Sequence, residues 1–433
     1  MAPVKPLALL TSAALMGSVV LTSGASLAKS HGPKVTISFM EAMSSGTLAT
    51  TLQKLVSQFE AAHPTIAVNL QAEPSYTVLQ QKEEAAIAAH NPPTIGQAYE
   101  DWAASYAASD AIVPLSSYVH GRNGVSQAYI RTMWKEVWND QFLPNGKMYM
   151  WPFNKSDYIM YYNQNFLKRL GMQIPTNWNQ LAAVSKAATS SKKDTWGFSF
   201  DTGDLSGAAN GTFLALIMAQ DYGATFYKNG KIAFDSPATV HALGLLRQLV
   251  RRGAAKVGTS YPGQTALDSN HSVFDLSTVA SYYYIQSGKT KGVSVGVSAF
   301  PSGPAGNTNL MEGTNLVIFS RATTAERQAA WTFMKWLTQA KQTAEWAEGT
   351  GYLPVVRTAI HLMGKYYREN PYQKIAAQEL AKAAPTPAVP GIGQAQDIWA
   401  ATLQKILTTN VNLKQALQEG QQQAQQALAE SKP

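Results

Sequence analysis

The sequence predicts an α/β protein of two lobes joined by a hinge, with a cleft between them. Strand and helix patterns alternate in one stretch of the chain and again in a second, and each stretch is long enough for an α/β lobe. Between the stretches, the proline-containing segment 151–154 precedes a continuous apolar run at 158–162. Pro152 has no N–H for a central strand, whereas the apolar run is typical of a strand covered on both faces. The chain is therefore expected to cross between lobes there.

The first stretch of alternation predicts a parallel sheet. Residues 35–39 alternate as a strand, and helix 48–62 has apolar residues on one face before His-Pro ends it. Strand 66–70, helix 76–89 and strand 94–99 follow. Such β-α-β units favour a right-handed crossover and parallel pairing. Ligands bind at the carboxyl ends of strands in sheets of this kind.

The second stretch has the same character. It contains helix 178–188, strand 196–200 and helix 211–220. Asn-Gly within 228–231 predicts a hairpin turn. Ser236-Pro237 predicts the start of a helix over 238–252.

The remaining third of the chain is predicted to return to the first lobe and then to leave it again. The expected elements are strand 293–297, a second crossing at 300–304, strand 316–319, helix 327–348, a third crossing at 349–354, a linker at 383–390 and helix 413–429. We therefore assign residues 29–151 and 308–350 to the first lobe, and residues 152–307 and 351–433 to the second.

Residues 1–28 are predicted to be a secretory signal. Lys5 gives a positive start, an apolar run covers 7–21, and Ser26-Leu-Ala28 is a small-x-small cleavage site. The alternative is an uncleaved anchor, although the run is short for a membrane span. The chain has no cysteine that could carry a lipid. We expect a protein secreted across the cytoplasmic membrane, either periplasmic or held at the cell surface.

The composition excludes several classes of function. Of 433 residues, 45% are hydrophobic and 14% are charged, which indicates a globular protein with a weakly charged surface. The net charge of +8 is spread along the chain without a basic stripe, so nucleic acid is not an expected partner. The absence of cysteine excludes disulfides, thiolate metal sites and a cysteine nucleophile.

The sequence carries no recognised catalytic motif. It has no HExxH, and its seven histidines are scattered singly. Gly288-Lys-Thr290 resembles the end of a phosphate-binding loop, but Tyr283 stands where that loop needs glycine. No glycine-flanked nucleophilic serine occurs, and Ser190-x-x-Lys193 lies in a polar loop. We expect no catalytic residue, metal or cofactor.

Polar and aromatic residues instead occur where two lobes would face each other. A sugar or polyol site needs aromatic faces for C–H surfaces, and carboxylates or amides for hydroxyls. The candidates are Glu41, Ser44, Tyr76, Glu100, Asp101, Ser156, Asp157, Ser277, Thr278, Gly313, Thr314, Asn315, Tyr352 and Trp399. Taken singly, each is as well explained as a cap, a turn residue or a satisfied surface group.

Two motifs identify a family resemblance. Pro-Phe-Asn at 152–154 with Tyr-Tyr-Asn at 161–163, and Thr-Gly-Tyr-Leu-Pro at 350–354, resemble the crossings of extracellular solute-binding proteins of ABC importers. The similar branch takes up sugars and glycerol 3-phosphate. The resemblance covers nearly the whole mature chain. It implies a periplasmic-binding-protein fold, a sugar or polyol ligand, permease subunits as partners, a monomer and no catalysis.

The resemblance also implies ligand contacts. The matching positions are Tyr76, Glu100 after the third strand, Ser156 after Pro-Phe-Asn, Ser277 and Thr278 in a serine-rich turn, Gly313, and Tyr352. Tyr352 lies in the most specific of these motifs.

Two departures from the family pattern concern the ligand. Trp399 stands where the branch has an arginine that clamps phosphate, and residues 201–204 replace tryptophans that stack the ligand. Loss of a bidentate cation disfavours a phosphate ester by a few kcal/mol, unless Lys155 or Arg357 substitutes. Trp399 is expected to stack a sugar ring or to cap a cationic head group. The sequence thus favours a neutral or glycerol-containing polyol over a bare phosphate ester.

Two other classes of function stay open at this point. A secreted glycoside hydrolase would use Glu100 and Asp157 as its carboxylates, about 5 to 9 Å apart across a sugar bond. A structural surface protein would have no use for hinge-like crossings.

Overall fold

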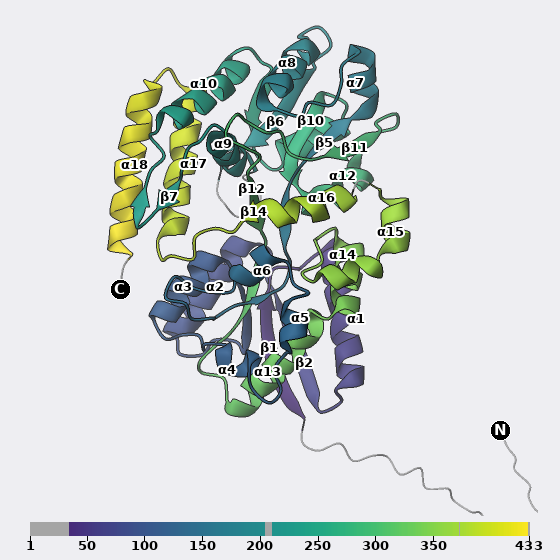
Figure 1. Ribbon diagram of the computed structural model, residues 1–433, viewed down its shortest axis with the longest axis vertical. Coiled ribbons are helices and arrows are strands. Elements are labelled where there is room, and N and C mark those ends of the chain that lie inside the picture. The colour runs from purple at the N-terminus through teal and green to yellow at the C-terminus, as the bar shows by residue number, and fades with distance from the viewer. Residues whose placement is uncertain (1–33, 204–209, 372, 432–433) are drawn as a thin grey trace, which may run out of the picture.

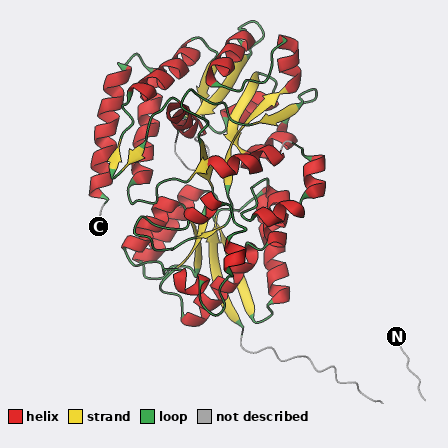
Figure 2. Cartoon of the chain, viewed as in Figure 1, coloured by secondary structure: helices red, strands yellow, loops and turns green. Residues whose placement is uncertain are grey.

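The computed structural model describes residues 34–203, 210–371 and 373–431. It has two lobes, lower and upper in Figure 1, each built on its own β-sheet (Figures 1 and 2). The predicted two-lobe α/β fold is confirmed. The predicted signal at 1–28 lies outside the described residues. Among the described helices, none is long and apolar enough to cross a bilayer.

The first sheet has the strand order β2-β1-β3-β13-β4. β1 (Val35–Glu41) pairs in parallel with β2 (Ile66–Ala72) and β3 (Ile95–Ala98), as the β-α-β pattern predicts. β13 (Asn315–Ile318) pairs antiparallel with β3 and with β4 (Trp151–Pro152). The helices of this lobe are α1 (Gly46–Ala62), α2 (Tyr76–Ala88), α3 (Glu100–Ala108), α4 (Ser116–Val119), α5 (Gln127–Ile130), α6 (Lys135–Asn139), α13 (Thr324–Leu337) and α14 (Ala340–Thr350).

The second sheet is organised around β5 (Ser156–Asn163), all eight residues of which are buried. β5 pairs antiparallel with β10, β11 and β12, within the order β14-β12-β5-β10-β6-β9. The other strands are β6 (Trp196–Asp201), β9 (Ala255–Gly258), β10 (Ser272–Thr278), β11 (Val295–Ser298), β12 (Asn309–Glu312), β14 (Ala383–Ala384) and the hairpin β7 (Tyr227–Lys228) with β8 (Lys231–Ile232). The predicted doubly covered strand is therefore the central strand of this lobe.

The second lobe carries most of the remaining helices. They are α7 (Gln164–Leu170), α8 (Trp178–Ala188), α9 (Asn210–Asp221), α10 (Pro237–Arg251), α11 (Pro262–Asp268), α12 (Tyr282–Gly288), α16 (Gln373–Glu379), α17 (Ile392–Thr408) and α18 (Leu413–Glu430). α15 (Gly364–Glu369) and the short 3₁₀ turns η1 (Val279–Ser281), η2 (Arg357–His361) and η3 (Leu380–Lys382) complete the described elements.

Some predicted elements differ from the structure. The second crossing, expected at 300–304, lies at 313–314, because residues 309–312 form β12 of the second sheet. The helix expected over 327–348 is broken at Thr338, whose hydroxyl accepts from Trp151 Nε1 (3.1 Å) and Tyr129 Oη (2.9 Å). These partners are distant in sequence, so apolar periodicity does not reveal the break. The expected serine-rich turn at Ser277 and Thr278 is the end of strand β10.

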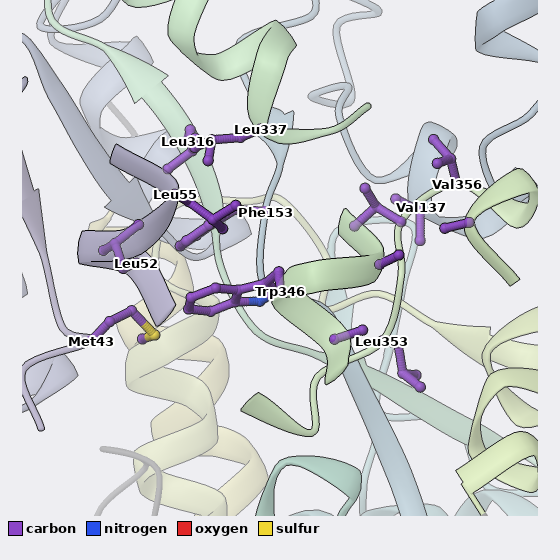
Figure 3. Close-up of a cluster of buried hydrophobic side chains, with 14 of the residues drawn as sticks. Met43, Leu52, Leu55, Val137, Phe153, Leu316, Leu337, Trp346, Leu353 and Val356 are labelled. Carbon is purple, nitrogen blue, oxygen red and sulfur yellow. The ribbon is translucent and has the colours of Figure 1, made fainter. Parts of the chain in front are cut away.

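Three chain segments meet between the lobes. Residues 153–155 join β4 to β5, and residues 313–314 join β12 to β13, so each links the two sheets. Leu353, after α14, pairs with Lys155 in an isolated bridge. We call residues 153–155, 313–314 and 353 the hinge. Figure 3 shows Phe153 pointing into the apolar cluster around Leu55 and Leu316, near the indole of Trp346 (ring centroids 5.0 Å apart), which fixes one side of the hinge to the first lobe.

Candidate ligand-binding site

A cleft of about 520 Å³ lies beside the hinge and is lined by residues of both lobes. Ser44 and Tyr76 belong to the first lobe, whereas Tyr261 and Ser281 belong to the second. A neighbouring cavity of about 410 Å³ shares four lining residues with the cleft, namely Tyr76, Tyr99, Phe213 and Glu312. The two cavities are therefore adjoining parts of one space between the lobes.

Several residues predicted from the sequence line this space. They are Ser44, Tyr76, Ser156, Thr278, Gly313 and Tyr352 in the cleft, and Asp101 in the neighbouring cavity. Their contact with a solute remains a prediction.

The Asp157 side chain lies on the face of β5 that points away from the cleft. Ser156 and Tyr158 both line the cleft, and alternate residues of a strand point to opposite faces. The Asp157 carboxylate is buried beside Glu379 of α16, and neither of its oxygens has a hydrogen-bond partner. Burial, and secondarily the Glu379 charge, raise the pKa of Asp157 well above its ordinary value. Asp157 therefore lines neither cavity.

Glu100 is bound by an internal cation rather than exposed to the cleft. Lys155 Nζ lies 3.1 Å from Glu100 Oε1 and 2.7 Å from Asp140 Oδ2, and it donates to the Gly313 carbonyl (3.2 Å). Asn315 Nδ2 donates to the same two carboxylates, at 3.1 and 2.9 Å. Burial and the Asp140 charge raise the pKa of Glu100 well above its ordinary value. We call Glu100, Asp140, Lys155 and Asn315 the hinge charge cluster.

The hinge charge cluster keeps Lys155 away from any solute. Burial alone would lower the pKa of Lys155, but Asp140 and Glu100 outweigh it and raise that pKa. Lys155 has no exposed side-chain surface and lines neither cavity. Arg357 lines neither cavity, and its guanidinium donates to the Arg131 carbonyl (2.6 Å). Neither of the expected substitute cations is thus available to a phosphate in these cavities.

Trp399 lies in the core of the second lobe rather than in the cleft. Its side chain is fully buried, its indole N–H donates to the Thr212 carbonyl (3.0 Å), and its ring lies 5.2 Å from that of Phe234. Gln396 and Asp397, within the preceding turn of α17, line the smaller cavity, whereas Trp399 does not. The structure therefore does not place Trp399 where it could stack a ring or cap a head group.

Hydrogen bonds at the hinge hold two of the predicted residues together. Asn154 Nδ2 donates to Tyr76 Oη (2.8 Å), and the Tyr76 and Tyr352 hydroxyls lie 3.4 Å apart. Asn154 Oδ1 accepts from the backbone N–H (3.0 Å) and the hydroxyl (2.7 Å) of Thr314. Tyr76 and Tyr352 are thus positioned by the same residues that join the lobes.

Gly313 has a structural reason to be glycine. Its φ is +91°, and a Cβ added there would lie 1.7 Å from the Asn154 carbonyl oxygen. Two crossing segments therefore approach too closely at this position for any side chain.

Ser277 supports a cleft residue from behind. Its hydroxyl lies 2.8 Å from that of Ser281, which lines the cleft, whereas Ser277 itself does not. The strand alternation that separates Ser156 from Asp157 also separates Thr278 from Ser277.

Three of the residues that line both cavities, Tyr99, Phe213 and Glu312, were not predicted from the sequence. Glu312 and Tyr99 are the immediate neighbours of predicted Gly313 and Glu100, so their proximity was a usable signal. Phe213 lies in an apolar helix and gives no such signal. Glu312 is partly buried, one of its carboxylate oxygens has no hydrogen-bond partner, and burial raises its pKa to about 8 although Lys155 acts to lower it.

Comparison with known proteins gives a consistent result. Residues 54–372 match the model of the bacterial extracellular solute-binding protein family. The sn-glycerol-3-phosphate-binding periplasmic protein of Pectobacterium atrosepticum is 24% identical over 407 residues, covering 89% of this chain and 87% of that protein.

Solved structures agree with the fold. A Mycobacterium tuberculosis protein, UgpB, in complex with glycerophosphocholine superposes with a TM-score of 0.79 at 20% identity, covering 92% of this chain and 99% of that one. A Listeria monocytogenes substrate-binding protein in complex with cycloalternan gives 0.80 at 16% identity, with the same coverage. With the two-lobe fold and the family match over residues 54–372, this chain belongs to the bacterial extracellular solute-binding proteins, which are non-enzymatic components of transporters.

Proposed function

We propose that this protein captures a neutral sugar or polyol between its lobes and delivers it to the permease of an ABC importer. The charge of the space between the lobes carries the proposal. Neither cavity has a lysine, arginine or histidine among its described lining residues. Hydroxyl groups and tyrosine rings dominate the cleft, and these recognise the hydroxyls and C–H faces of sugars.

Acidic side chains make the smaller cavity unfavourable for an anion. Glu84, Asp101 and Asp397 line it, whereas Glu312, which lines both cavities, is largely protonated at neutral pH because its pKa is about 8. Burial raises the pKa of Asp101 to about 6, so its carboxyl is ionised for the most part at neutral pH. A phosphate without a paired cation would lose its hydration and gain no compensating charge.

The geometry suggests how capture is coupled to transport. Both lobes of one chain line the cleft, so we infer that a monomer suffices to hold the solute. A solute that contacts both lobes favours the closed arrangement through those added contacts. We infer that the closed lobes form the surface read by the permease, and that the protein acts after secretion, either in the periplasm or at the cell surface. We infer that the lobe boundaries lie at the hinge segments, 153–155, 313–314 and 353, a few residues beyond the boundaries expected from the sequence at 151–152, 307–308 and 350–351.

Titration calorimetry of the mature protein tests the proposal. The test solutes are maltotriose, trehalose, cellobiose, raffinose, glycerol 3-phosphate and glycerophosphocholine. We expect at least one neutral saccharide to bind with a Kd of about 1 μM, or roughly 8 kcal/mol, and glycerol 3-phosphate to bind roughly 100-fold more weakly. Tightest binding of glycerol 3-phosphate would contradict the neutral-solute proposal, and the absence of binding to all six would contradict the proposed function.

The glycoside hydrolase alternative is not supported by the site. Glu100 belongs to the hinge charge cluster, and Asp157 faces α16, so neither carboxylate lines either cavity. No pair of carboxylates is thus placed across a sugar bond by these two residues.

A further inference from the structure

We propose that the end of the second lobe opposite the cleft is a membrane-binding surface, which attaches this protein to a bilayer of anionic phospholipid while the cleft stays open to solutes. The cations of this surface are scattered in the sequence, and the fold gathers them. We use the name basic edge for the exposed side chains of Lys192, Lys193, Arg252, Lys256, Lys289 and Lys291.

The topology of the second sheet brings these cations together. β6, β9 and β10 run parallel to one another, and β5 runs antiparallel to β10 and β11. The starts of β6, β9, β10 and β11 therefore lie beside the end of β5, at the upper end of the molecule in Figure 1. The basic edge lies on the loops that precede β6, β9 and β11 and on the second residue of β9. Ser156 and Thr278 line the cleft from the other ends of β5 and β10.

Few negative charges offset the basic edge. On the loops at this end of the sheet, 189–195, 252–256, 268–271 and 289–294, the acidic residues are Asp194 and Asp268, and Asp268 is buried. Asp194 Oδ1 lies 3.3 Å from Lys256 Nζ. Within the part of the chain that the structure describes, the other five cations have no acidic partner closer than 4.0 Å. Cations gathered in this way produce a positive potential at this end of the molecule.

Helix dipoles do not account for the gathering of these cations. Basic residues commonly complement the carboxyl end of a helix, and Arg252 follows α10 in this way. Lys192 and Lys193, however, lie beyond the end of α8 at Ala188, and Lys256 lies within β9. The field of a helix dipole falls off within its last turn. These three lysines therefore have another reason to be at this edge.

The layout of the basic edge fits a planar surface. Neighbouring strands are about 4.8 Å apart, so the strands from β9 through β6, β10 and β5 to β11 spread the cations over roughly 20 Å. None of the six cations lines either cavity. All but Arg252 are lysines, whose point charges attract phosphate without the bidentate geometry of arginine. Exposed lysines spread along an edge suit the head groups of an anionic bilayer, to which each cation near the surface adds attraction.

Sedimentation with sucrose-loaded vesicles tests the membrane-binding surface. The vesicles contain either equal parts of phosphatidylglycerol and phosphatidylcholine or phosphatidylcholine alone, in about 50 mM and about 500 mM NaCl. The mature protein is compared with a basic-edge variant that carries Lys192→Gln, Lys193→Gln, Lys289→Gln and Lys291→Gln. The control variant removes the same charge from exposed lysines of the first lobe, with the changes Lys34→Gln, Lys135→Gln, Lys147→Gln and Lys341→Gln.

We expect the mature protein to bind the mixed vesicles at low salt. Binding should be weaker by roughly 10-fold or more at high salt, which screens exposed charges, and with phosphatidylcholine alone. The basic-edge variant should also bind the mixed vesicles roughly 10-fold more weakly or worse, whereas the control variant should stay within about threefold of the unchanged protein. The unfolding temperatures of both variants should be nearly unchanged, because the substituted side chains are exposed.

Three results would overturn the membrane-binding surface. Equal weakening in the two variants would show that net charge acts rather than the basic edge. The absence of binding to mixed vesicles at low salt, or equal binding to phosphatidylcholine alone, would exclude recognition of anionic lipid. Binding of soluble dextran sulfate without binding of mixed vesicles would assign the basic edge to an anionic polymer. Because none of these measurements includes a solute, each result leaves the proposed function standing.

Discussion

Lys155→Met is expected to lower the free energy of unfolding by about 3 to 5 kcal/mol. The substitution keeps an unbranched side chain of similar size and removes the ammonium group, with its bonds to Glu100, Asp140 and the Gly313 carbonyl. Glu100 and Asp140 would then remain buried beside each other, with Asn315 as their shared donor and no cation between them. Removing one member of a buried ion cluster is costly because the remaining charges stay desolvated without compensation. Urea-induced unfolding measures the change directly.

Lys54→Met is the matched control for this prediction. Lys54 Nζ lies 2.7 Å from Glu345, but the Lys54 side chain is 64% exposed. Surface pairs of this kind contribute about 0 to 1 kcal/mol. A loss no larger in Lys155→Met than in the control would refute the role assigned to the hinge charge cluster. Adding Glu100→Gln and Asp140→Asn to Lys155→Met should recover part of the stability, which distinguishes an effect of charge from one of packing.

Gly313→Ala is expected to cost about 2 to 5 kcal/mol, from left-handed backbone strain together with a steric clash. The clash is with the Asn154 carbonyl oxygen, a backbone atom that cannot rotate away, at 1.7 Å from the added Cβ. Relief would require the two crossing segments to separate, and their separation would also disturb the bonds from Thr314 to Asn154.

Gly292→Ala isolates the backbone part of this cost. Gly292 has nearly the same φ, +93°, and an added Cβ would meet nothing within 4 Å. Its expected cost is therefore only the left-handed strain of about 1 to 2 kcal/mol. Thermal unfolding of both variants gives the comparison. Equal losses would show that the hinge is not tightly packed at Gly313.

Most of the fold was predictable because its signals are local. The apolar run of β5, the Ser-Pro start of α10 and the Asn-Gly hairpin each depend on adjacent residues. The break between α13 and α14 was not predictable, since it depends on side chains more than a hundred residues away. Local pattern thus fixes which elements form, and distant contacts decide where they end.

The site was less predictable because tertiary packing decides which face of a helix or strand is turned toward the cleft. Strand alternation allows only one of Ser156 and Asp157 to face the cleft, yet the sequence does not say which one. Glu100 follows the third strand as expected, but its burial against Lys155 depends on three separate chain segments. Trp399 packs into the core of the second lobe, and its position relative to a motif carries no information about where its side chain packs.

Tyr261 and Tyr284 line the cleft although the sequence analysis did not predict them. Tyr261 carries no motif, and only its exposure, its backbone conformation and the bond from Ser260 to Asp201 distinguish it. These are properties of the folded chain.

Small-angle X-ray scattering, with and without a saturating saccharide identified by calorimetry, tests most directly whether two lobes close over a neutral solute. We predict a smaller radius of gyration and a shorter maximum dimension with the saccharide, and no change with glycerol 3-phosphate. A saccharide that saturates the protein by calorimetry yet leaves the scattering profile unchanged would contradict the account.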